Sequence, residues 1–383
     1  MNILYLSSRF GKGYFGMEKC LDNLVYNLPN HSHTFIGKDP CNVIFDKSKS
    51  DRISNRIKQH IWYGGFEATG WKKKLVSPIF FITTLLSTVV FAKDFKRADI
   101  IVLPASILGE SVYLNWYFRI FHKKVVQIIH LNDCPDYIVH NPFIKLALNT
   151  WNNGTMVFVS QAQKSLWQAN NLVSKNSPVI YGGVAIGDQL QPKTLYSNNL
   201  KIGFVGRLHN DKGLDILLRA LSQLDLDDKK IKLKVEIAGN GEHKGQILEV
   251  YQSLSFDSRI TIEFLDFQSD VANFVESQDL IVYPSRLESF GLVVIESYER
   301  GIPVLTSNLD CFEEIKSFTN DIERELMFES ENVANLVSKL LMFVNNPTRY
   351  TNENQRLILR QSVIDNFGIE QSITQYEKLF LSL

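Results

Sequence analysis

The chain has 383 residues, of which 45% are hydrophobic and 21% are charged, and its 41 Lys and Arg residues equal its 41 Asp and Glu residues in number. This composition is typical of a folded globular protein and excludes a disordered chain, and the length predicts two domains. The four cysteines show no CxxC spacing and no secretory signal precedes the strand expected at Ile3, so we expect a cytoplasmic protein without a structural metal site.

The net charge of zero hides a division between the two halves of the chain. Residues 1–180 contain 21 Lys and Arg against 11 Asp and Glu, a net charge of +10, and residues 181–383 contain 20 against 30, a net charge of −10. A basic first half predicts an anionic partner, such as a membrane surface, a phospholipid or a phosphorylated acceptor. The alternative is that the two halves differ by chance or attract each other. We expect no nucleic-acid partner.

Short apolar runs alternate with helical patterns along the whole chain. A helix is expected from about Met17 to Leu28. A polar segment at about residues 182–199 interrupts the pattern and is interpreted as a linker. Strands are expected at residues 3–6, 33–36, 100–103, 125–129, 156–159 and 179–181 before this linker, and at residues 202–205, 233–237, 260–264, 280–283 and 304–305 after it.

Short apolar strands separated by helices are typical of parallel sheets covered by helices on both faces. The sequence therefore predicts an α/β fold with two doubly wound, Rossmann-like domains in tandem. We expect an N-terminal domain at residues 1–183 and a C-terminal domain at residues 200–365. Ligands are expected at the carboxyl ends of the strands, in a cleft between the domains.

Leu75–Ala92 is an uncharged stretch of 18 residues that follows Lys72–Lys74. Its length is at the lower limit for a membrane span, but it contains Pro78 and a strand is expected soon after it. We therefore favour a buried helix over a face that docks on a membrane, and a true span is the least favoured interpretation. The lysines and the nearby Trp71 keep peripheral contact with an anionic membrane open.

The most informative motif is YPSRLESFGLVVIE at residues 283–296, which places Glu288 and Glu296 eight residues apart around a strand-to-helix turn. Gly291 is expected to open the helix, so the backbone amides of residues 290–292 point out of its N-terminus, where a phosphate or sugar hydroxyls can bind. A carboxylate accepts hydrogen bonds from vicinal hydroxyls. The pattern predicts a nucleotide-sugar site, and the alternative is a helix start with one capping and one solvated acid.

A second motif follows the strand at residues 202–205. Arg207 and Lys212 lie five residues apart in the loop before a helix expected at residues 214–221. Two cations beside a helix N-terminus can neutralise a pyrophosphate without a metal ion. The loop at residues 239–241 follows another strand of the same sheet and fits the same site, whereas solvated surface residues are the alternative.

The segments GRLHNDKG, IAGNGE and PSRLESFGLVVIES, in this order within residues 201–310, resemble the second domain of the retaining glycosyltransferases of family 4, which have the GT-B fold. The resemblance implies that Glu288 holds hydroxyls of the donor sugar, Glu296 the ribose, and the two cations the diphosphate. It also implies no metal or cofactor, an active site between the domains and a last helix at residues 366–383 that crosses back to the first domain. The implied donor-binding residues are Gly16, Gly206, Arg207, Lys212, Gly239, Glu288, Ser289, Phe290, Gly291, Leu292 and Glu296.

The first domain resembles the family less closely. Family members usually carry a Gly-Gly pair followed by Glu after the first strand, and here Phe15 replaces the first glycine, although Gly16 still allows a phosphate to approach the backbone. His130 ends the strand at residues 125–129, where the family has its active-site histidine. Asp133 is a candidate for orienting this histidine or for contacting the acceptor. The implied catalytic residues are His130, Glu288, Arg207 and Lys212.

Together these features predict a retaining, metal-independent hexosyltransferase. It would move a hexose from a nucleoside diphosphate sugar, with UDP favoured, to a hydroxyl of a glycan or glycolipid acceptor. We expect a lipid-linked acceptor in cell-surface polysaccharide or lipopolysaccharide biosynthesis, at the inner face of the cell membrane. Two alternatives stay open, namely another GT-B enzyme such as a UDP-sugar epimerase or phosphorylase, and a non-catalytic relative that binds nucleotide sugars. The acidic run at residues 225–228 resembles a DxD metal motif but is interpreted as a solvated turn.

Overall fold

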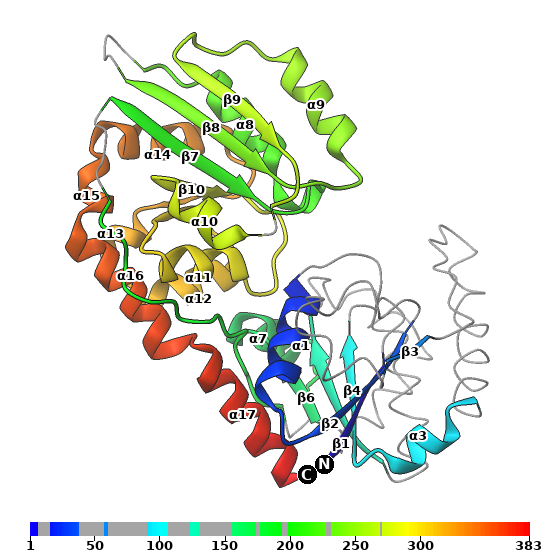
Figure 1. Cartoon of the computed structure of the whole chain (residues 1–383). Coiled ribbons are helices and arrows are strands. Elements are labelled where there is room, and N and C mark those ends of the chain that lie inside the picture. The colour runs from blue at the N-terminus through cyan, green and yellow to red at the C-terminus, as the bar shows by residue number, and fades with distance from the viewer. Residues whose placement is uncertain are drawn as a thin grey trace. The chain divides into compact units, whose positions relative to one another are not determined.

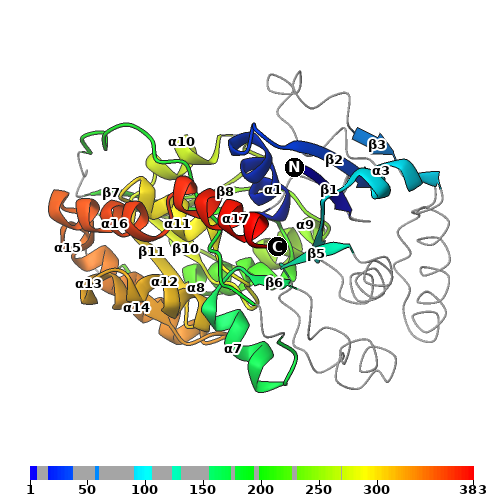
Figure 2. The same ribbon diagram turned by 90° about the horizontal axis from the view of Figure 1, so that it is seen from below.

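The protein divides into two compact units, and each contains one parallel sheet with helices packed against it (Figures 1 and 2). The first unit comprises Met1–Gly183 and Ile369–Leu383, and the second comprises Val184–Gly368. The computed structural model describes residues 1–6, 16–37, 57–59, 90–105, 123–130, 155–173, 177–193, 198–226, 231–268 and 270–383.

The sheet of the first unit has the strand order β3-β2-β1-β4-β5-β6, and all its strand pairs are parallel. Four consecutive residues of β1 and five of β5 are buried, as expected for strands covered on both faces. The strands are β1 (Asn2–Leu6), β2 (Ser32–Gly37), β3 (Ile57–Gln59), β4 (Ile100–Ala105), β5 (Lys124–Ile129) and β6 (Thr155–Phe158). The described helices are α1 (Gly16–Asn27), α3 (Ala92–Arg97), α7 (Gln161–Ala169) and α17 (Ile369–Ser382).

The sheet of the second unit has the order β12-β11-β10-β7-β8-β9, which is the same doubly wound order, and its pairs are also parallel. Its strands are β7 (Asn199–Val205), β8 (Lys232–Ala238), β9 (Ile260–Leu265), β10 (Leu280–Tyr283), β11 (Val304–Ser307) and β12 (Met327–Phe328). Its helices are α8 (Leu214–Ser222), α9 (Lys244–Ser253), α10 (Val271–Glu276), α11 (Leu292–Glu299), α12 (Asp310–Ser317), α13 (Asp321–Arg324), α14 (Val333–Asn345), α15 (Pro347–Thr351) and α16 (Glu353–Asn366), with a 3₁₀ helix at Asn210–Lys212.

Short polar side chains start several helices of the second unit. Asp270, Asn320, Asn332 and Asn352 each accept a hydrogen bond from the backbone amide three residues later, at the starts of α10, α13, α14 and α16. Such caps satisfy an amide that has no partner inside the helix. The helices then bury apolar faces against the sheet, and α8 alone buries six residues between Leu214 and Leu221.

The end of the described chain completes the first unit. We expected one helix from Asn366 onward, but α16 ends at Asn366 and α17 begins at Ile369, with Gly368 between them. Gly368 pairs with Val184 in a parallel bridge, so the two places where the chain passes between the units lie side by side. In the first unit, α17 packs against α1, and a side chain added at Gly183 would lie 2.6 Å from the Ile369 Cα atom.

One other expectation needs correction. Residues 179–181 do not form a full strand, because only Val179 pairs with the sheet, in an isolated bridge to Phe158. The short strands β3 and β12 were not predicted. The segment interpreted as a linker is held against α16, since Arg360 donates hydrogen bonds to the carbonyl oxygens of Gly187 and Asp188.

The stretch considered as a membrane segment, Leu75–Ala92, lies outside the described residues except for its last three, and Lys72–Lys74 lie outside them entirely. Among the residues that the structure describes, no helix combines the length and the apolar character needed to cross a membrane.

Candidate functional site

The two sequence motifs meet at the centre of the second sheet. Strands β7 and β10 are neighbours, although β8 and β9 lie between them in the sequence, so the chain leaves this pair toward opposite sides of the sheet. In doubly wound sheets ligands bind at the carboxyl ends of such a pair. The segment GRLHNDKG follows β7 and PSRLESFG follows β10. Both motifs therefore lie at the carboxyl ends of these two neighbouring strands, which we call the carboxyl edge of the sheet.

Lys212 and Glu288 form a largely buried ion pair there, with side chains that are 13% and 12% exposed. The ammonium group of Lys212 donates a short hydrogen bond to Glu288 Oε2. The Tyr283 hydroxyl donates to the same oxygen at 3.2 Å, and the ammonium nitrogen lies 5.4 Å from the centre of the Tyr283 ring. Sequence reasoning missed Tyr283, and its position as the last residue of the buried strand β10 was the available signal.

The electrostatics of this cluster keep the lysine charged. Burial acts to lower the pKa of Lys212, but the interactions within the cluster outweigh this effect and the pKa is raised. At neutral pH the charged partner of Lys212 in the cluster is Glu288. Burial raises the pKa of Tyr283 to about 12, so its hydroxyl is a neutral hydrogen-bond donor at neutral pH. The cluster therefore offers a fixed ammonium group beside a carboxylate oxygen that already accepts two hydrogen bonds.

Glycines allow the loops to approach each other closely. Gly213 has a φ of 64°, and a Cβ atom added to it would lie 1.9 Å from the carbonyl oxygen of Pro284. Gly239 has a φ of 148°, and its Cβ atom would lie 1.9 Å from the carbonyl oxygen of Gly206. The three loops after β7, β8 and β10 therefore pack backbone against backbone, which only glycine permits at these positions.

The turn after β10 leads directly into α11. Gly291, with a φ of 107°, precedes the first helical residue, Leu292. The first amides of a helix have no partner within it and lie at the positive end of its dipole. The side chain of Phe290 is buried, and the centre of its ring lies 5.8 Å from that of Phe367. Ser289 donates its amide to Glu288 Oε1 at 3.3 Å.

The other predicted residues of the second unit lie in the loop after β7 and on α11. Arg207 follows β7, its side chain is 36% exposed, and its Nη2 atom lies 3.6 Å from Asp211 Oδ2. Gly206 donates its amide to the Ala238 carbonyl at 3.0 Å. Glu296 is half-buried and lies within α11. Glu288, the partner of Lys212, lies in the turn before this helix.

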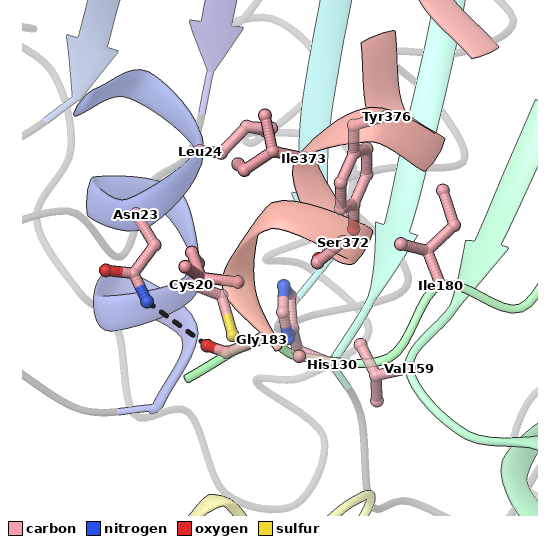
Figure 3. Close-up of a pocket in the computed structure, with 12 residues that line it drawn as sticks. Cys20, Asn23, Leu24, His130, Val159, Ile180, Gly183, Ser372, Ile373 and Tyr376 are labelled. Atoms are coloured by element: carbon pink, nitrogen blue, oxygen red, sulfur yellow. Dashed lines mark hydrogen bonds between the residues drawn. The ribbon is translucent and has the colours of Figure 1, made fainter. Parts of the chain in front are cut away.

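In the first unit, His130 follows β5 and lines a pocket with residues of α1 and α17 (Figure 3). Its Nε2 atom is buried and has no hydrogen-bond partner among the described residues. Burial lowers the pKa of His130 to about 4, so the imidazole is neutral at pH 7. Gly16 is the first residue of α1, which also contributes Cys20 and Asn23 to the pocket. Asp133 lies outside the described residues.

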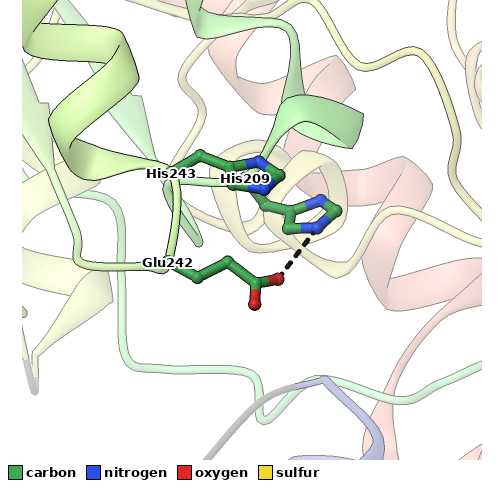
Figure 4. Close-up of side chains that lie close together, drawn as sticks. All are labelled: His209, Glu242 and His243. Carbon is green, nitrogen blue, oxygen red and sulfur yellow. Dashed lines mark ion pairs between the residues drawn. The ribbon is translucent and has the colours of Figure 1, made fainter. Parts of the chain in front are cut away.

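His209, Glu242 and His243 lie close together in the loops after β7 and β8 (Figure 4). The two imidazole rings are stacked 4.4 Å apart at an angle of 19°, and His209 Nε2 lies 3.0 Å from Glu242 Oε1. The lone pairs of two nearly parallel rings do not converge on one ion at the roughly 2.0–2.1 Å that Zn²⁺ requires. His243 Nδ1 also accepts the Asn210 amide at 2.9 Å. This arrangement joins two loops and does not have the geometry of a metal site.

Comparison with known proteins shows that most of the second unit is similar to a family of glycosyl transferases. Residues 187–360 match the family described as Glycosyl transferases group 1. An uncharacterized glycosyltransferase of Haemophilus influenzae is 28% identical over 228 residues, which are 58% of this chain and 60% of that protein. The O-antigen biosynthesis glycosyltransferase WclY of Escherichia coli is 26% identical over 220 residues, 55% of this chain and 57% of that protein. The matched region thus spans somewhat more than half the length of these two relatives.

The whole chain also resembles a solved structure. The crystal structure of Anabaena Alr3699/HepE in complex with UDP and glucose matches 100% of both chains with a TM-score of 0.73 and 17% identity. At this identity the likeness shows the fold alone. The predicted fold class, GT-B with two tandem Rossmann-like domains, is confirmed.

Proposed function

We propose, from the similarity of residues 187–360 to the family Glycosyl transferases group 1, that this protein is a retaining, metal-independent hexosyltransferase that uses a nucleoside diphosphate sugar. The observation that carries the proposal is the Lys212 and Glu288 pair at the carboxyl ends of β7 and β10. A fixed cation suits a diphosphate, and a carboxylate suits the hydroxyls of a sugar. Both groups lie beside the N-terminus of α11, whose free amides favour an anion.

In the proposed reaction, a hydroxyl oxygen of the acceptor forms a new bond to the anomeric carbon while the bond from that carbon to the diphosphate oxygen breaks. The acceptor attacks from the face that the diphosphate leaves, so the anomeric configuration is retained. The departing diphosphate oxygen takes up the acceptor's proton, and no protein base is required. Arg207 and Lys212 stabilise the negative charge that develops on the diphosphate. Glu288 is proposed to orient the sugar, and His130 is proposed as a further catalytic residue.

The comparisons support a choice of substrate class. The HepE structure contains UDP and glucose, and WclY is named for O-antigen biosynthesis. We therefore propose a UDP-hexose donor and a glycan acceptor, carried on a lipid, in the assembly of a cell-surface polysaccharide. Peripheral attachment to an anionic membrane through the basic first half belongs to the same proposal and rests on the charge division of the sequence.

A screen of nucleotides followed by a transfer assay tests the proposal. UDP, GDP and their hexose conjugates are added to the protein, and a ligand at about 100 times its dissociation constant should stabilise it by roughly 2.7 kcal/mol. The stabilising nucleotide sugar is then incubated with glycan acceptors, and NMR of the product should show the anomeric configuration of the donor. Inversion would contradict the retaining mechanism, and conversion of the nucleotide sugar without an acceptor would indicate an epimerase.

Metal independence has its own test. The protein is dialysed against EDTA and assayed with and without added Mn²⁺ or Mg²⁺. Because two side-chain cations are proposed to neutralise the diphosphate, turnover should be the same before and after dialysis. Loss of turnover that either ion restores would overturn this part of the proposal.

A further inference from the structure

Arg286, in the turn between β10 and α11, forms ionic contacts that the sequence motifs did not predict. Its Nη1 and Nη2 atoms donate to the two carboxylate oxygens of Asp215 at 2.7 and 2.8 Å, a bidentate pair. Its Nε and Nη2 atoms donate to the two oxygens of Glu331 at 2.5 and 3.2 Å. Its Nη1 atom also donates to the carbonyl oxygen of Asn210 at 2.8 Å. One guanidinium group thus connects the turn after β10 with the segment Asn210–Asp215 and with Glu331 in the loop before α14.

The backbone of Arg286 strengthens the same connection. Its amide donates to the carbonyl oxygen of Asp211 at 2.7 Å. The side chain and the main chain of one residue therefore both hold the segment from Asn210 to Asp215. Lys212 lies within this segment, and Glu288 lies two residues after Arg286. Arg286 therefore contacts the segment that carries Lys212, and it lies itself in the turn that carries Glu288.

The charges of this connection persist at neutral pH. The hydrogen bonds that Arg286 donates to Asp215 are the largest influence on the pKa of Arg286 and raise it. Burial acts to raise the pKa of Asp215, but the hydrogen bonds and the charge of Arg286 outweigh it and the pKa is lowered. A planar guanidinium that meets a carboxylate through two parallel hydrogen bonds fixes orientation as well as distance, which a lysine at this position would not do.

Glu331 adds an independent observation. It has a φ of 67°, in the left-handed region that residues other than glycine seldom adopt. Such a conformation persists only where the surrounding contacts determine it, and these residues cluster at functional sites. Both of its carboxylate oxygens are bound by Arg286. The guanidinium group therefore contacts a residue whose backbone conformation is unfavourable, in the loop before α14.

We propose that Arg286 is a positioning residue, which sets the distance between Lys212 and Glu288 at the value that a bound diphosphate sugar requires. This inference rests on the proposed function for the identity of the ligand. Arg286 acts through the two loops and does not itself contact the substrate. A displacement of about 1 Å between groups that hold a substrate can lower turnover about a hundredfold.

The test compares Arg286→Gln with Arg349→Gln. Glutamine keeps hydrogen-bonding groups but loses the charge and the bidentate geometry. Arg349 is a matched control, because it also binds one carboxylate, that of Glu325, through two hydrogen bonds of 2.6 and 3.2 Å. Glu325 lies just before β12, at the amino edge of the sheet and away from the candidate site. Both variants are assayed well below their melting temperatures, so that all molecules are folded.

We expect Arg286→Gln to weaken UDP binding about tenfold in calorimetry and to lower kcat/KM for the UDP-sugar about a hundredfold. Arg349→Gln should change neither quantity. A role in stability alone would lower the melting temperature but leave UDP affinity and KM of the folded protein unchanged. Normal UDP affinity and normal kcat/KM in Arg286→Gln would overturn the inference.

Hydrogen exchange separates this inference from the proposed function. In Arg286→Gln the amides of residues 207–215 and 286–291 should exchange faster than in the wild type, and in Arg349→Gln they should not. This measurement needs no ligand. If the wild type binds no nucleoside diphosphate, the proposed function fails, whereas unchanged exchange in both segments of Arg286→Gln contradicts the positioning role whatever the protein binds.

Discussion

At the scale of single residues, the candidate site depends on a lysine that stays charged in a nearly buried position. Burial opposes the charge of Lys212, and at neutral pH the ion pair with Glu288 compensates for it. A cation that the protein already holds in position stabilises a developing negative charge strongly, because no solvent has to reorganise at the moment of reaction. Lys212 is therefore the residue whose loss we expect to affect turnover most.

We predict that Lys212→Ala and Arg207→Ala each lower kcat about a hundredfold or more, since removing one preorganised donor to a developing oxyanion costs on the order of 3 kcal/mol. The fold should stay intact, as measured by circular dichroism. Lys201→Ala is the control, because Lys201 is exposed near the amino end of β7, away from the site. Near-normal turnover in both site variants would show that the diphosphate assignment is wrong.

His130 should make the first unit sensitive to acid. Its pKa in the folded protein is about 4, below the ordinary value of 6.5, so the unfolded chain binds more protons between these values. The stabilising contribution is complete above pH 6.5 and is lost as the pH falls toward 4. Urea unfolding of the wild type and of His130→Asn between pH 7.5 and 4.5 measures it. The wild type should lose stability more steeply on acidification, and parallel pH profiles would contradict the assignment.

At the scale of elements, the strands and the turn after β10 could be predicted because their physical signals are local. The run Leu280–Tyr283 is wholly apolar and is observed as a strand, and Gly291 was expected to open α11 and is observed just before it. The contacts of Tyr283 and Arg286 could not be predicted, since their partners are far away in the sequence and become neighbours only through the strand order. The two-residue strand β12 is too short to leave a pattern.

Gly213 provides a prediction for the loop after β7. Gly213→Ala places a Cβ atom 1.9 Å from the Pro284 carbonyl oxygen in a conformation with a φ of 64°, so one of the two loops has to move. We expect a loss of about 1–3 kcal/mol in unfolding free energy and a fall in turnover. The matched control is Gly245→Ala in α9, where an added Cβ atom meets nothing within 4 Å. That change should be neutral or stabilise by up to about 1 kcal/mol. Equal effects of the two substitutions would contradict the close packing of the loops.

At the scale of the whole molecule, the sequence predicted two doubly wound units but not their strand order. Because β7 and β10 are neighbours in the sheet, residues about eighty positions apart in the chain lie side by side. No local sequence pattern predicts this pairing. The family resemblance predicted that the last helix belongs to the first unit. The amphipathic pattern of this helix did not predict it. In the structure, α17 belongs to the first unit, and Ile373, Tyr376 and Phe380 on it are buried.

We predict that a substitution in α17 destabilises the first unit selectively. Phe380 is 1% exposed and its neighbour Leu381 is 69% exposed. Phe380→Ala should cost about 3–5 kcal/mol, whereas Leu381→Ala should have little effect. Hydrogen exchange of Phe380→Ala should increase in β1 and α1 and stay unchanged in β7 and β10. Equal loss of protection in both units would show that they unfold as one body.

The placement of α17 has a consequence for synthesis on the ribosome. Domains usually fold in the order in which they emerge, with the N-terminal one first. Here the first unit cannot finish folding until residues 369–382 have left the exit tunnel, by which time all of Val184–Gly368 has been available to fold. Until then, apolar side chains that α17 covers, such as those of Leu24 and Ile180 in the pocket beside His130, are left open to water. The nascent chain therefore exposes an unfinished N-terminal half through most of its translation, and this is the interval in which we expect a chaperone to bind it.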